Sequence, residues 1–489
     1  MASELYLGFD VGTQGTKALV VDVERRAILA RSSRSYGLIP DLPPGAAEQH
    51  PDTWWQAVRE CTREVMTRVD ARAIRSVGVS GQQHGFVALD SERQVLRPAK
   101  LWCDTSTAAE ARELTVSLGR HVPAGFTAPK ILWLKRHEPA CFARLAHVLL
   151  PHDWVNLRLT GELVMEAGDA SGTGLFDPLT RRFDARACFA IDERLEAKLP
   201  RLASPDEPIG RVTAEAAREL GITAGIAVAP GGGDNMCAAI GAGATRPGVA
   251  VLSLGTSATV FAYSPRCVLD PAGLIAPFCD STGAWLPLLC VMNATGVLQE
   301  VVRAFGSADL DIDALTRAAE RLPAGNDGLL FLPFLCGERV PDLPEATGAL
   351  LGLRPGSLEP ARLFRAALEG VSLNLAGGVE RLRTLGLAVD TVRLVGGGAR
   401  NALWARILAD ALAARVQRVA ELESAAFGAA LQAAWVARRA AGEQGSLDAF
   451  VQGVVALEGE ALEPETANVA LYRAARERFD DGVRRLFGA

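Results

Sequence analysis

The chain has 489 residues, 49% of them hydrophobic and 22% charged, and 51 Lys and Arg stand against 57 Asp and Glu for a net charge of −6. At about 150 residues per domain, this length predicts two to four domains with large cores. The acidic balance provides no basic patch, so neither nucleic acid nor an anionic membrane is expected as a main partner.

No apolar run in the sequence reaches the roughly 18 residues that a membrane span needs. The first 22 residues carry Glu4, Asp10 and Asp22 among their apolar residues, which is unlike a signal peptide. Nine cysteines never stand closer than eleven residues apart, so zinc knuckles and a disulfide framework lack support and we expect reduced, mostly buried thiols. Together these features predict a cytoplasmic protein.

Residues 5–23 predict a β-hairpin with its tip at 13–15, followed by a third antiparallel strand over 27–34. The Gly- and Thr-rich tip offers backbone N–H groups to an anion without bulky side chains. Asp10 ends the first strand, where a carboxylate can meet a magnesium ion held by that anion, and Lys17 can neutralise charge. The spacing is not that of a Walker P-loop. An ordinary hairpin with a polar tip is the alternative.

The hairpin pattern recurs over residues 249–262, and the Gly-Thr pairs at positions 12 and 255 are 243 residues apart, about half the chain. Such a repeat predicts two similarly built domains, 1–245 and 246–489, divided near the Gly/Ala/Thr/Pro stretch 242–247. Helical and strand periods alternate in both halves, which indicates the α/β class.

Several particular elements follow from the periodicity and the capping residues. We expect a helix capped by Asp52, a strand over 74–80, a long helix over 359–385, a strand over 391–395, a helix capped by Asn401, and helices throughout 425–489.

Two further glycine-rich turns accompany the first hairpin. Gly255, Thr256 and Ser257 form a second hairpin tip, and the glycines at 396–398 open a strand-to-helix loop. Two tips that face one another can hold a polyphosphate, and a triple glycine lets the backbone lie flat against a purine or ribose. We infer a nucleotide in an interdomain cleft, with a simple turn at 396–398 as the alternative.

Two polar loops follow predicted strands. Asp234 stands on the glycine loop 231–235, where it can accept a hydroxyl proton during phosphoryl transfer; a surface carboxylate is the alternative. The loop 81–85 contains Gln83 and His84 and is dense in donors and acceptors, which suits a polyol. Trp102 and Asp104 add an apolar face and an acceptor. For His84 alone, a structural role is the alternative.

Taken together, these segments resemble the FGGY carbohydrate kinases of the actin, sugar-kinase and chaperone-ATPase superfamily, and most closely those that phosphorylate xylulose. The segments that carry the resemblance are 8–13, 81–85, 125–133, 231–235, 254–257, 334–339, 368–370 and 396–400. The resemblance implies two ribonuclease-H-like α/β domains with mixed sheets around an interdomain cleft. It implies the reaction of ATP with D-xylulose to give ADP and D-xylulose 5-phosphate, with Mg²⁺.

The resemblance also implies roles for individual residues. Asp234 is the expected proton acceptor, and Asp10 the residue near the metal, directly or through water. Substrate contacts are expected from Gln83, His84, Asp234, Asn235, Trp102 and Asp104. Nucleotide contacts are expected from Gly12, Thr13, Gln14, Thr16, Lys17, Gly255, Thr256, Ser257, Gly397, Gly398 and Asn401. We assign no role to Glu166.

Alternatives remain at this point. The same scaffold suits a kinase for ribulose, gluconate or glycerol, and a non-catalytic sugar or nucleotide sensor is a third possibility. A homodimer is expected from the resemblance only.

Overall fold

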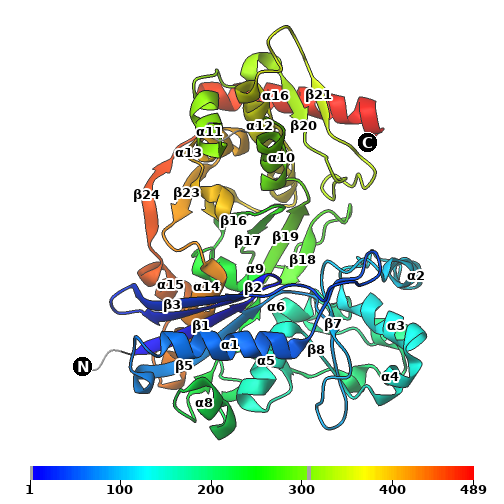
Figure 1. Cartoon of the computed structure of the whole chain (residues 1–489), viewed down its shortest axis with the longest axis vertical. Coiled ribbons are helices and arrows are strands. Elements are labelled where there is room, and N and C mark those ends of the chain that lie inside the picture. The colour runs from blue at the N-terminus through cyan, green and yellow to red at the C-terminus, as the bar shows by residue number, and fades with distance from the viewer. Residues whose placement is uncertain (1–3, 306–309, 489) are drawn as a thin grey trace.

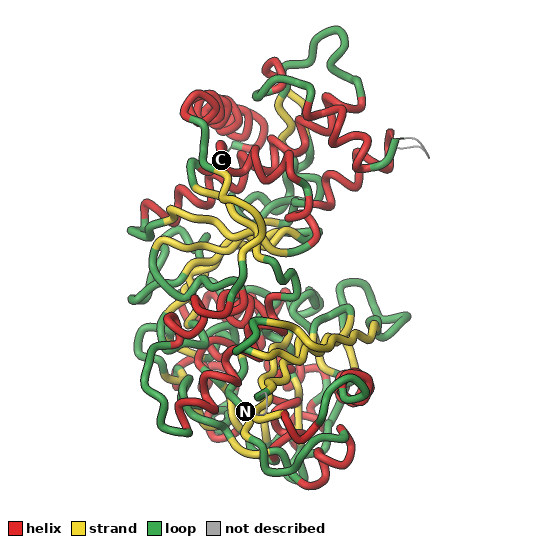
Figure 2. Tube along the Cα trace, turned by 90° about the vertical axis from the view of Figure 1, so that its left-hand side faces the viewer, coloured by secondary structure: helices red, strands yellow, loops and turns green. Residues whose placement is uncertain are grey.

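The computed structural model describes residues 4–305 and 310–488, which form two halves, each built on a seven-stranded sheet. Figure 1 shows the N-terminal half, blue to green, below the C-terminal half. Figure 2, turned by 90°, shows helices between the two yellow sheets as well as outside them. This is the predicted architecture of two α/β halves with mixed sheets.

The N-terminal sheet begins with the predicted hairpin. Strands β1 (Leu5–Val11) and β2 (Gly15–Asp22) pair antiparallel, and β3 (Ala27–Ser35) continues the sheet beside β2. On the other side of β1 lies β5 (Ile74–Gly81), which runs parallel to it. The strand order is β13-β14-β5-β1-β2-β3, and β15 also pairs with β5. The added strands are β13 (Gly210–Arg211), β14 (Ala227–Val228) and β15 (Gly232–Gly233).

The C-terminal sheet repeats this pairing. Strands β16 (Gly248–Leu254) and β17 (Ala258–Ala262) form an antiparallel hairpin, and β22 (Val389–Val395) runs parallel to β16. The strand order is β18-β19-β17-β16-β22-β23-β24. The added strands are β18 (Ala276–Cys279), β19 (Trp285–Val291), β23 (Arg415–Val419) and β24 (Leu457–Leu462). The repeat inferred from the two Gly-Thr pairs therefore corresponds to two sheets of related topology.

Two local predictions were wrong. Helix α1 (Pro51–Val65) is capped by His50, whose side chain accepts from the N–H of Asp52, and not by Asp52 as predicted. The helix begins earlier, at Pro51, because a proline suits the first helical position. The segment 425–489 is not entirely helical, since β24 interrupts it and pairs antiparallel with β23. Most residues of β24 are exposed, so the strand lacks the alternation of buried residues that predicts a strand.

Helices α9 (Asp234–Gly241) and α14 (Ser424–Ala440) cross closely between the sheets. A β-carbon on Gly428 would lie 1.8 Å from the carbonyl oxygen of Cys237, so only glycine permits this approach. Helix α14 also packs on β1 and β5 of the N-terminal sheet. The chain thus returns from the C-terminal sheet to cover the N-terminal one. The division after residue 245 stays a prediction.

The remaining helices cover the sheets or belong to the insertion, the segment 82–209 between β5 and β13 of the N-terminal sheet. In the first half they are α2 (Ala108–Leu118), α3 (Thr127–His137), α4 (Pro139–Arg144), α5 (Pro151–Thr160), α6 (Ala167–Ala170), α7 (Ala185–Ile191) and α8 (Ala214–Leu220). In the second half they are α10 (Thr295–Phe305), α11 (Ile312–Glu320), α12 (Pro360–Thr384), α13 (Ala402–Leu412), α15 (Leu447–Val454) and α16 (Thr466–Phe487).

Two sequence expectations bear on the whole chain. All nine cysteines are free, and only Cys336 is exposed. Within residues 4–305 and 310–488, no helix combines the length and the apolar character that crossing a membrane requires.

Candidate active site

The two predicted catalytic carboxylates lie at one edge of the N-terminal sheet. Asp10, the second-last residue of β1, is paired with Ser80 of β5, whose Oγ donates to Asp10 Oδ1 at 3.1 Å. Ser80 is in turn paired with Gly232 of β15. Asp234 follows two residues later as the first residue of α9. Parallel strand pairing therefore brings together residues that are more than 200 positions apart.

Both carboxylates are hard to ionise. Burial, opposed by Lys17 and the Ser80 hydroxyl, raises the pKa of Asp10 to about 6. Burial and the negative charge of Asp10 raise the pKa of Asp234 to about 7. Two neighbouring carboxylates with raised pKa values are typical of a site that transfers protons or binds a cation.

Asn235 links the carboxylate pair to the loop 81–85, which we call the sugar loop, and to the C-terminal half. Its Nδ2 donates to Asp234 Oδ1 and to Gln83 Oε1, both at 3.0 Å. Its Oδ1 accepts from Thr259 Oγ1 of β17 at 3.1 Å. The predicted residues 83, 234 and 235 are thus in contact, and the C-terminal half reaches them through Thr259.

The imidazole of His84 lies beside this group between aromatic rings. Its centroid is 4.7 Å from that of Phe126 and 5.9 Å from that of Phe278 on β18. Burial lowers the pKa of His84 to about 3, so the ring is neutral at pH 7. The Nε2 of Gln83 is buried without a hydrogen-bond partner in the described structure, whereas the Nδ1 of His84 faces the backbone of Gly172. An unpartnered buried group of this kind fits a hydroxyl of a ligand.

The tip of the first hairpin is held from several sides. Thr13 Oγ1 donates to Gln82 Oε1 at 2.8 Å and accepts from Trp102 Nε1 at 2.9 Å, and the carbonyl of Thr13 accepts from Gln49 Nε2 at 2.7 Å. Tyr36 donates from its hydroxyl to the carbonyl of Gly12 at 2.9 Å. The tip is therefore a fixed platform, and Trp102 lies against it.

Other residues predicted for this tip have different surroundings. Gln14 is exposed. Thr16 is fully buried, and its hydroxyl lies 3.0 Å from that of Tyr36, so it faces the protein. Lys17 forms an ion pair with Glu423, just before α14, which joins the hairpin to the other half.

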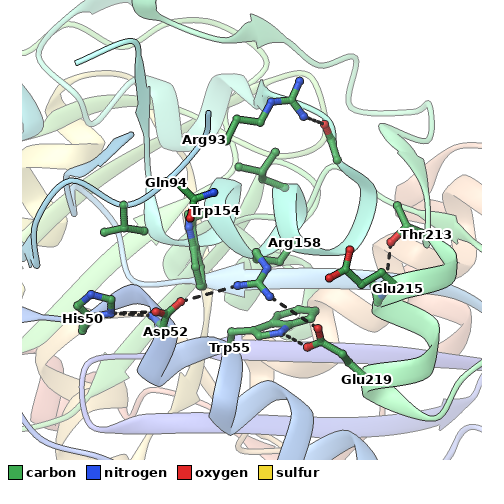
Figure 3. A pocket seen from close by; sticks show the side chains of 14 residues that line it. His50, Asp52, Trp55, Arg93, Gln94, Trp154, Arg158, Thr213, Glu215 and Glu219 are labelled. Atoms are coloured by element: carbon green, nitrogen blue, oxygen red, sulfur yellow. Dashed lines mark hydrogen bonds and ion pairs between the residues drawn. The ribbon is translucent and has the colours of Figure 1, made fainter. Parts of the chain in front are cut away.

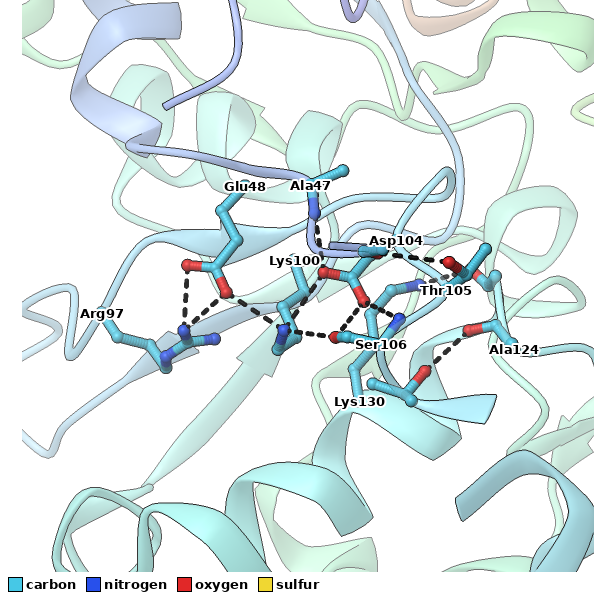
Figure 4. Close-up of polar contacts among 12 residues, drawn as sticks. Ala47, Glu48, Arg97, Lys100, Asp104, Thr105, Ser106, Ala124 and Lys130 are labelled. Atoms are coloured by element: carbon cyan, nitrogen blue, oxygen red, sulfur yellow. Dashed lines mark hydrogen bonds and ion pairs between the residues drawn. The ribbon is translucent and has the colours of Figure 1, made fainter. Parts of the chain in front are cut away.

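Asp104 lies in a separate buried network, which Figure 4 shows. Its carboxylate accepts from the N–H of Ala47 at 2.9 Å, from Ser106 Oγ at 2.6 Å and from Lys100 Nζ at 3.1 Å. Lys100 also pairs with Glu48 at 3.1 Å. These contacts occupy the carboxylate, and the predicted contact of Asp104 with a substrate stays a prediction.

The two glycine loops of the C-terminal half lie side by side at the ends of β16 and β22. Gly396 has a φ of +82°, and a β-carbon there would lie 2.8 Å from the carbonyl oxygen of Leu254. Thr295, the first residue of α10, donates from its N–H and its hydroxyl to the carbonyl of Gly255 at 3.0 and 2.7 Å. Gly255 and Thr256 are exposed, but the N–H of Gly255 donates to the carbonyl of Ser257 at 3.0 Å, so of these two residues only Thr256 has an N–H without a described backbone partner.

Asn401, which was predicted to contact the nucleotide together with Gly397 and Gly398, has a structural function. Asn401 caps α13 by accepting from the N–H of Trp404 at 3.0 Å, as predicted, and donates to Thr316 Oγ1 at 2.9 Å. Both ends of its side chain are occupied. Gly397, in contrast, has open space around its α-carbon.

A buried cluster of titratable side chains beneath the loop 81–85 was not predicted from the sequence. His152 Nδ1 lies 2.7 Å from Asp169 Oδ2, and its Nε2 lies 3.1 Å from Asp153 Oδ1. Burial alone lowers the pKa of His152, but the two carboxylates raise it to about 9. A β-carbon on Gly172 would lie 2.3 Å from His84 Cε1. The segment that begins with α6 therefore supports the His84 ring, although its residues show no periodic pattern in the sequence.

Glu166, to which we assigned no role, caps α6. Burial raises its pKa to about 7, while His152 opposes this shift. Its Oε2 accepts from the N–H of Gly168 at 2.7 Å, and its Oε1 lies 3.3 Å from the position of a β-carbon on Gly232. The segment that begins with Glu166 and α6 therefore touches both the loop 81–85, through Gly172, and the loop that carries Asp234.

A cavity of about 600 Å³ lies elsewhere, among α1, α5 and α8, and is drawn in Figure 3. The guanidinium of Arg158 stacks on Trp55 and Trp154, with its carbon 4.9 and 5.5 Å from their ring centroids. Arg158 also pairs with Asp52 at 3.7 Å and Glu219 at 3.9 Å. These charges compensate one another, and the cavity contains none of the predicted site residues.

No group of three or more metal-binding side chains occurs within the described residues. A magnesium ion that is held mainly by nucleotide phosphates needs only one or two protein carboxylates. Asp10 fits that need, since Ser80 occupies Oδ1 and no described hydrogen bond reaches Oδ2.

The comparisons with known proteins agree on one family. Residues 5–241 match the N-terminal domain of the FGGY family of carbohydrate kinases, and residues 250–437 match its C-terminal domain. The chain belongs to this family. Individual FGGY relatives match over nearly the whole length, for example the xylulose kinase of Haemophilus influenzae, which is 36% identical over 97% of this chain and 98% of its own.

Solved structures of FGGY kinases share the fold. One described as a "xyloylose kinase" from Brucella ovis has a TM-score of 0.90 at 32% identity and covers 99% of both chains. The gluconate kinase of Lactobacillus acidophilus reaches the same TM-score with the same coverage at 23% identity, which shows the fold alone. The predicted fold and sugar-kinase class are therefore confirmed, and as an FGGY kinase the chain uses ATP. The roles of individual site residues stay predictions.

Proposed function

We propose that the chain transfers the terminal phosphoryl group of ATP to D-xylulose and releases ADP and D-xylulose 5-phosphate. The observation that carries this proposal is the convergence of Asp10, Gln83, His84, Asp234 and Asn235 at one sheet edge, touched by Thr259 of the other half. The full-length similarity to a xylulose kinase supports the choice of sugar.

In this mechanism Asp234 is the general base. The terminal hydroxyl oxygen of the sugar attacks the γ-phosphorus, and its proton passes to Asp234 as the new P–O bond forms. The bond from the γ-phosphorus to the oxygen of ADP breaks, and ADP leaves with that electron pair. A pKa of about 7 suits a base at neutral pH, and Asn235 orients the carboxylate through its hydrogen bond to Oδ1.

The sugar is held by neutral groups. The unpartnered Nε2 of Gln83 donates to a hydroxyl, and the neutral imidazole of His84 donates to or accepts from another. Such contacts orient a polyol without repelling the phosphoryl group. Phe126 and Phe278 keep His84 in place.

The glycine loops hold the nucleotide. The N–H groups of Gly12 and Gly255 are bonded within their own turns, so the backbone N–H groups at 13–14 and 256–257 bind phosphate oxygens. The open backbone of Gly397 lies against the ribose or purine. Asp10 would hold Mg²⁺, directly or through water, and the ion would neutralise phosphate charge. We further propose that the enzyme is cytoplasmic and dimeric.

Ribulose, gluconate and glycerol remain alternative substrates, because the same scaffold occurs in a gluconate kinase. A coupled ADP-release assay across pentuloses, hexuloses, sugar acids and polyols distinguishes them. We expect kcat/KM for D-xylulose to exceed that for every other acceptor by at least about tenfold. A higher value for another acceptor would reassign the substrate, and ADP release that no acceptor stimulates would indicate a sensor.

A further inference from the structure

Arg339 stands on a rigid loop of the C-terminal half. The carboxylate of Glu338 is buried beneath it and accepts from the N–H groups of Met292 at 2.6 Å and Arg339 at 2.8 Å, and from Asn293 Nδ2 at 3.1 Å. These bonds fix the backbone of Arg339, while the residue itself is exposed. The loop therefore presents a guanidinium from a fixed base.

The contacts of Arg339 place it on the face of the C-terminal sheet that meets the sugar loop. Its Nη1 lies 4.0 Å from Cys290 Sγ on β19. Cys290 is paired with Thr259 of β17, and directly paired residues project to the same face. Thr259 is the residue that donates to Asn235, next to Asp234. The guanidinium thus lies one strand away from the contact between the halves.

Electrostatics agree with this position. Burial is the main cause of the low pKa of His84, and the positive charges of Lys130 and, to a smaller extent, Arg339 add to it. Arg339 therefore acts across the boundary between the halves on a residue of the sugar loop.

The other cations near this edge are already engaged. Lys130 donates from Nζ to the backbone carbonyls of His84, Gly125 and Phe126, and burial lowers its pKa to about 7. Lys17 pairs with Glu423. Arg339, in contrast, has no carboxylate within ion-pair distance among residues 4–305 and 310–488. Apart from Nη1, which lies 4.0 Å from Cys290 Sγ, the donors of its guanidinium have no described partner.

A phosphoryl group that arrives between Asp10 and Asp234 meets two carboxylates, so its transfer needs compensating positive charge. A guanidinium offers paired donors that match phosphate oxygens. We propose that Arg339 binds the phosphoryl group during transfer and then holds the phosphate of the product, an inference that rests on the proposed function. It is thus a catalytic residue contributed by the C-terminal half.

The test compares Arg339→Gln and Arg339→Lys with the matched control Arg354→Gln, which alters an exposed arginine just after β21 (Ala349–Leu351). Arg339→Gln should lower kcat by about 10²-fold, the scale of losing one transition-state donor, and leave the KM for sugar within about threefold. It should also weaken inhibition by the phosphorylated sugar by at least about tenfold. Arg339→Lys should recover part of both effects, and Arg354→Gln should change neither.

Thermal unfolding shows whether each variant is folded. Because both arginines are exposed, we expect all the variants to fold. A kcat for Arg339→Gln within about threefold of the wild type would overturn the proposal. A rise in the KM for sugar alone would also overturn it, since Arg339 would then contact the sugar. If the wild-type enzyme prefers another acceptor, the same variants are assayed with that acceptor and its phosphate, so the two proposals fail separately.

Discussion

Asp234 and Asp10 illustrate how burial tunes two similar side chains at the residue scale. Asp10 lies near the end of β1 and Asp234 follows β15 of the same sheet, and both lose water on folding, but only the pKa of Asp234 reaches about 7. The charge of Asp10 contributes to that value. A base with this pKa is partly protonated at neutral pH, which makes its activity sensitive to pH.

We predict that kcat/KM for the sugar falls below pH 7. Asp234 accepts a proton only when it is ionised, and its pKa of about 7 means that the active fraction falls about tenfold for each further pH unit. A steady-state pH profile from 5.5 to 9 measures this. The residual activity of Asp234→Asn should lack this inflection. A wild-type profile that is flat between pH 6 and 8 would contradict the assignment.

The positions of candidate site residues could be predicted where glycines and a polar side chain stand at the end of a strand, as at Asp10, Gln83 and Asp234. Their partners could not, because they come from distant segments: Thr259 from the other half, and Asp169 and His152 from the insertion. The local sequence also did not show that the carboxylate of Asp104 is bound by the buried Lys100, and its predicted substrate contact stays a prediction.

At the scale of elements, the crossing of α9 and α14 joins the two sheets. Gly241 of α9 and Gly428 of α14 each lie against the backbone of the other helix, where a β-carbon would meet a carbonyl oxygen at 2.0 and 1.8 Å. This close packing fixes the first turn of α9, and with it Asp234. The crossing is therefore structural support for the site.

We predict that Gly428→Ala destabilises the protein. Alanine usually favours a helix over glycine by up to about 1 kcal/mol, but here overpacking should cost about 1–3 kcal/mol. Thermal and urea unfolding measure the change. The matched control is Gly453→Ala in α15, where no atom lies within 4 Å of the added carbon, so stability should stay equal or rise. A Gly428→Ala variant as stable as this control would refute the packing argument.

Elements were predictable where buried residues kept a clear period. The two hairpins, β5, β22 and α12 agree with their predicted ranges to within a few residues. Strand β24 was missed because it is mostly exposed and exists through pairing with β23, a contact that the local sequence does not encode.

At the scale of the whole molecule, two repeats of one topology divide the chemistry. The N-terminal half provides the carboxylates and the sugar loop, and the C-terminal half provides two glycine loops, Thr259 and Arg339. The repeat was visible in the sequence as two Gly-Thr pairs. The return of α14 to the N-terminal sheet was not, because nothing in its periodicity identifies which sheet it covers.

The central claim is that Asp234 takes the proton of a sugar hydroxyl at the boundary between these halves. The most direct test is the turnover of Asp234→Asn in an ADP-release assay with saturating ATP and D-xylulose. The substitution keeps the shape of the side chain and removes the proton acceptor. We predict a loss of about 10²- to 10⁴-fold in kcat, with a circular dichroism spectrum and a KM for ATP close to those of the wild type. Turnover near the wild-type rate by the folded variant would contradict the account.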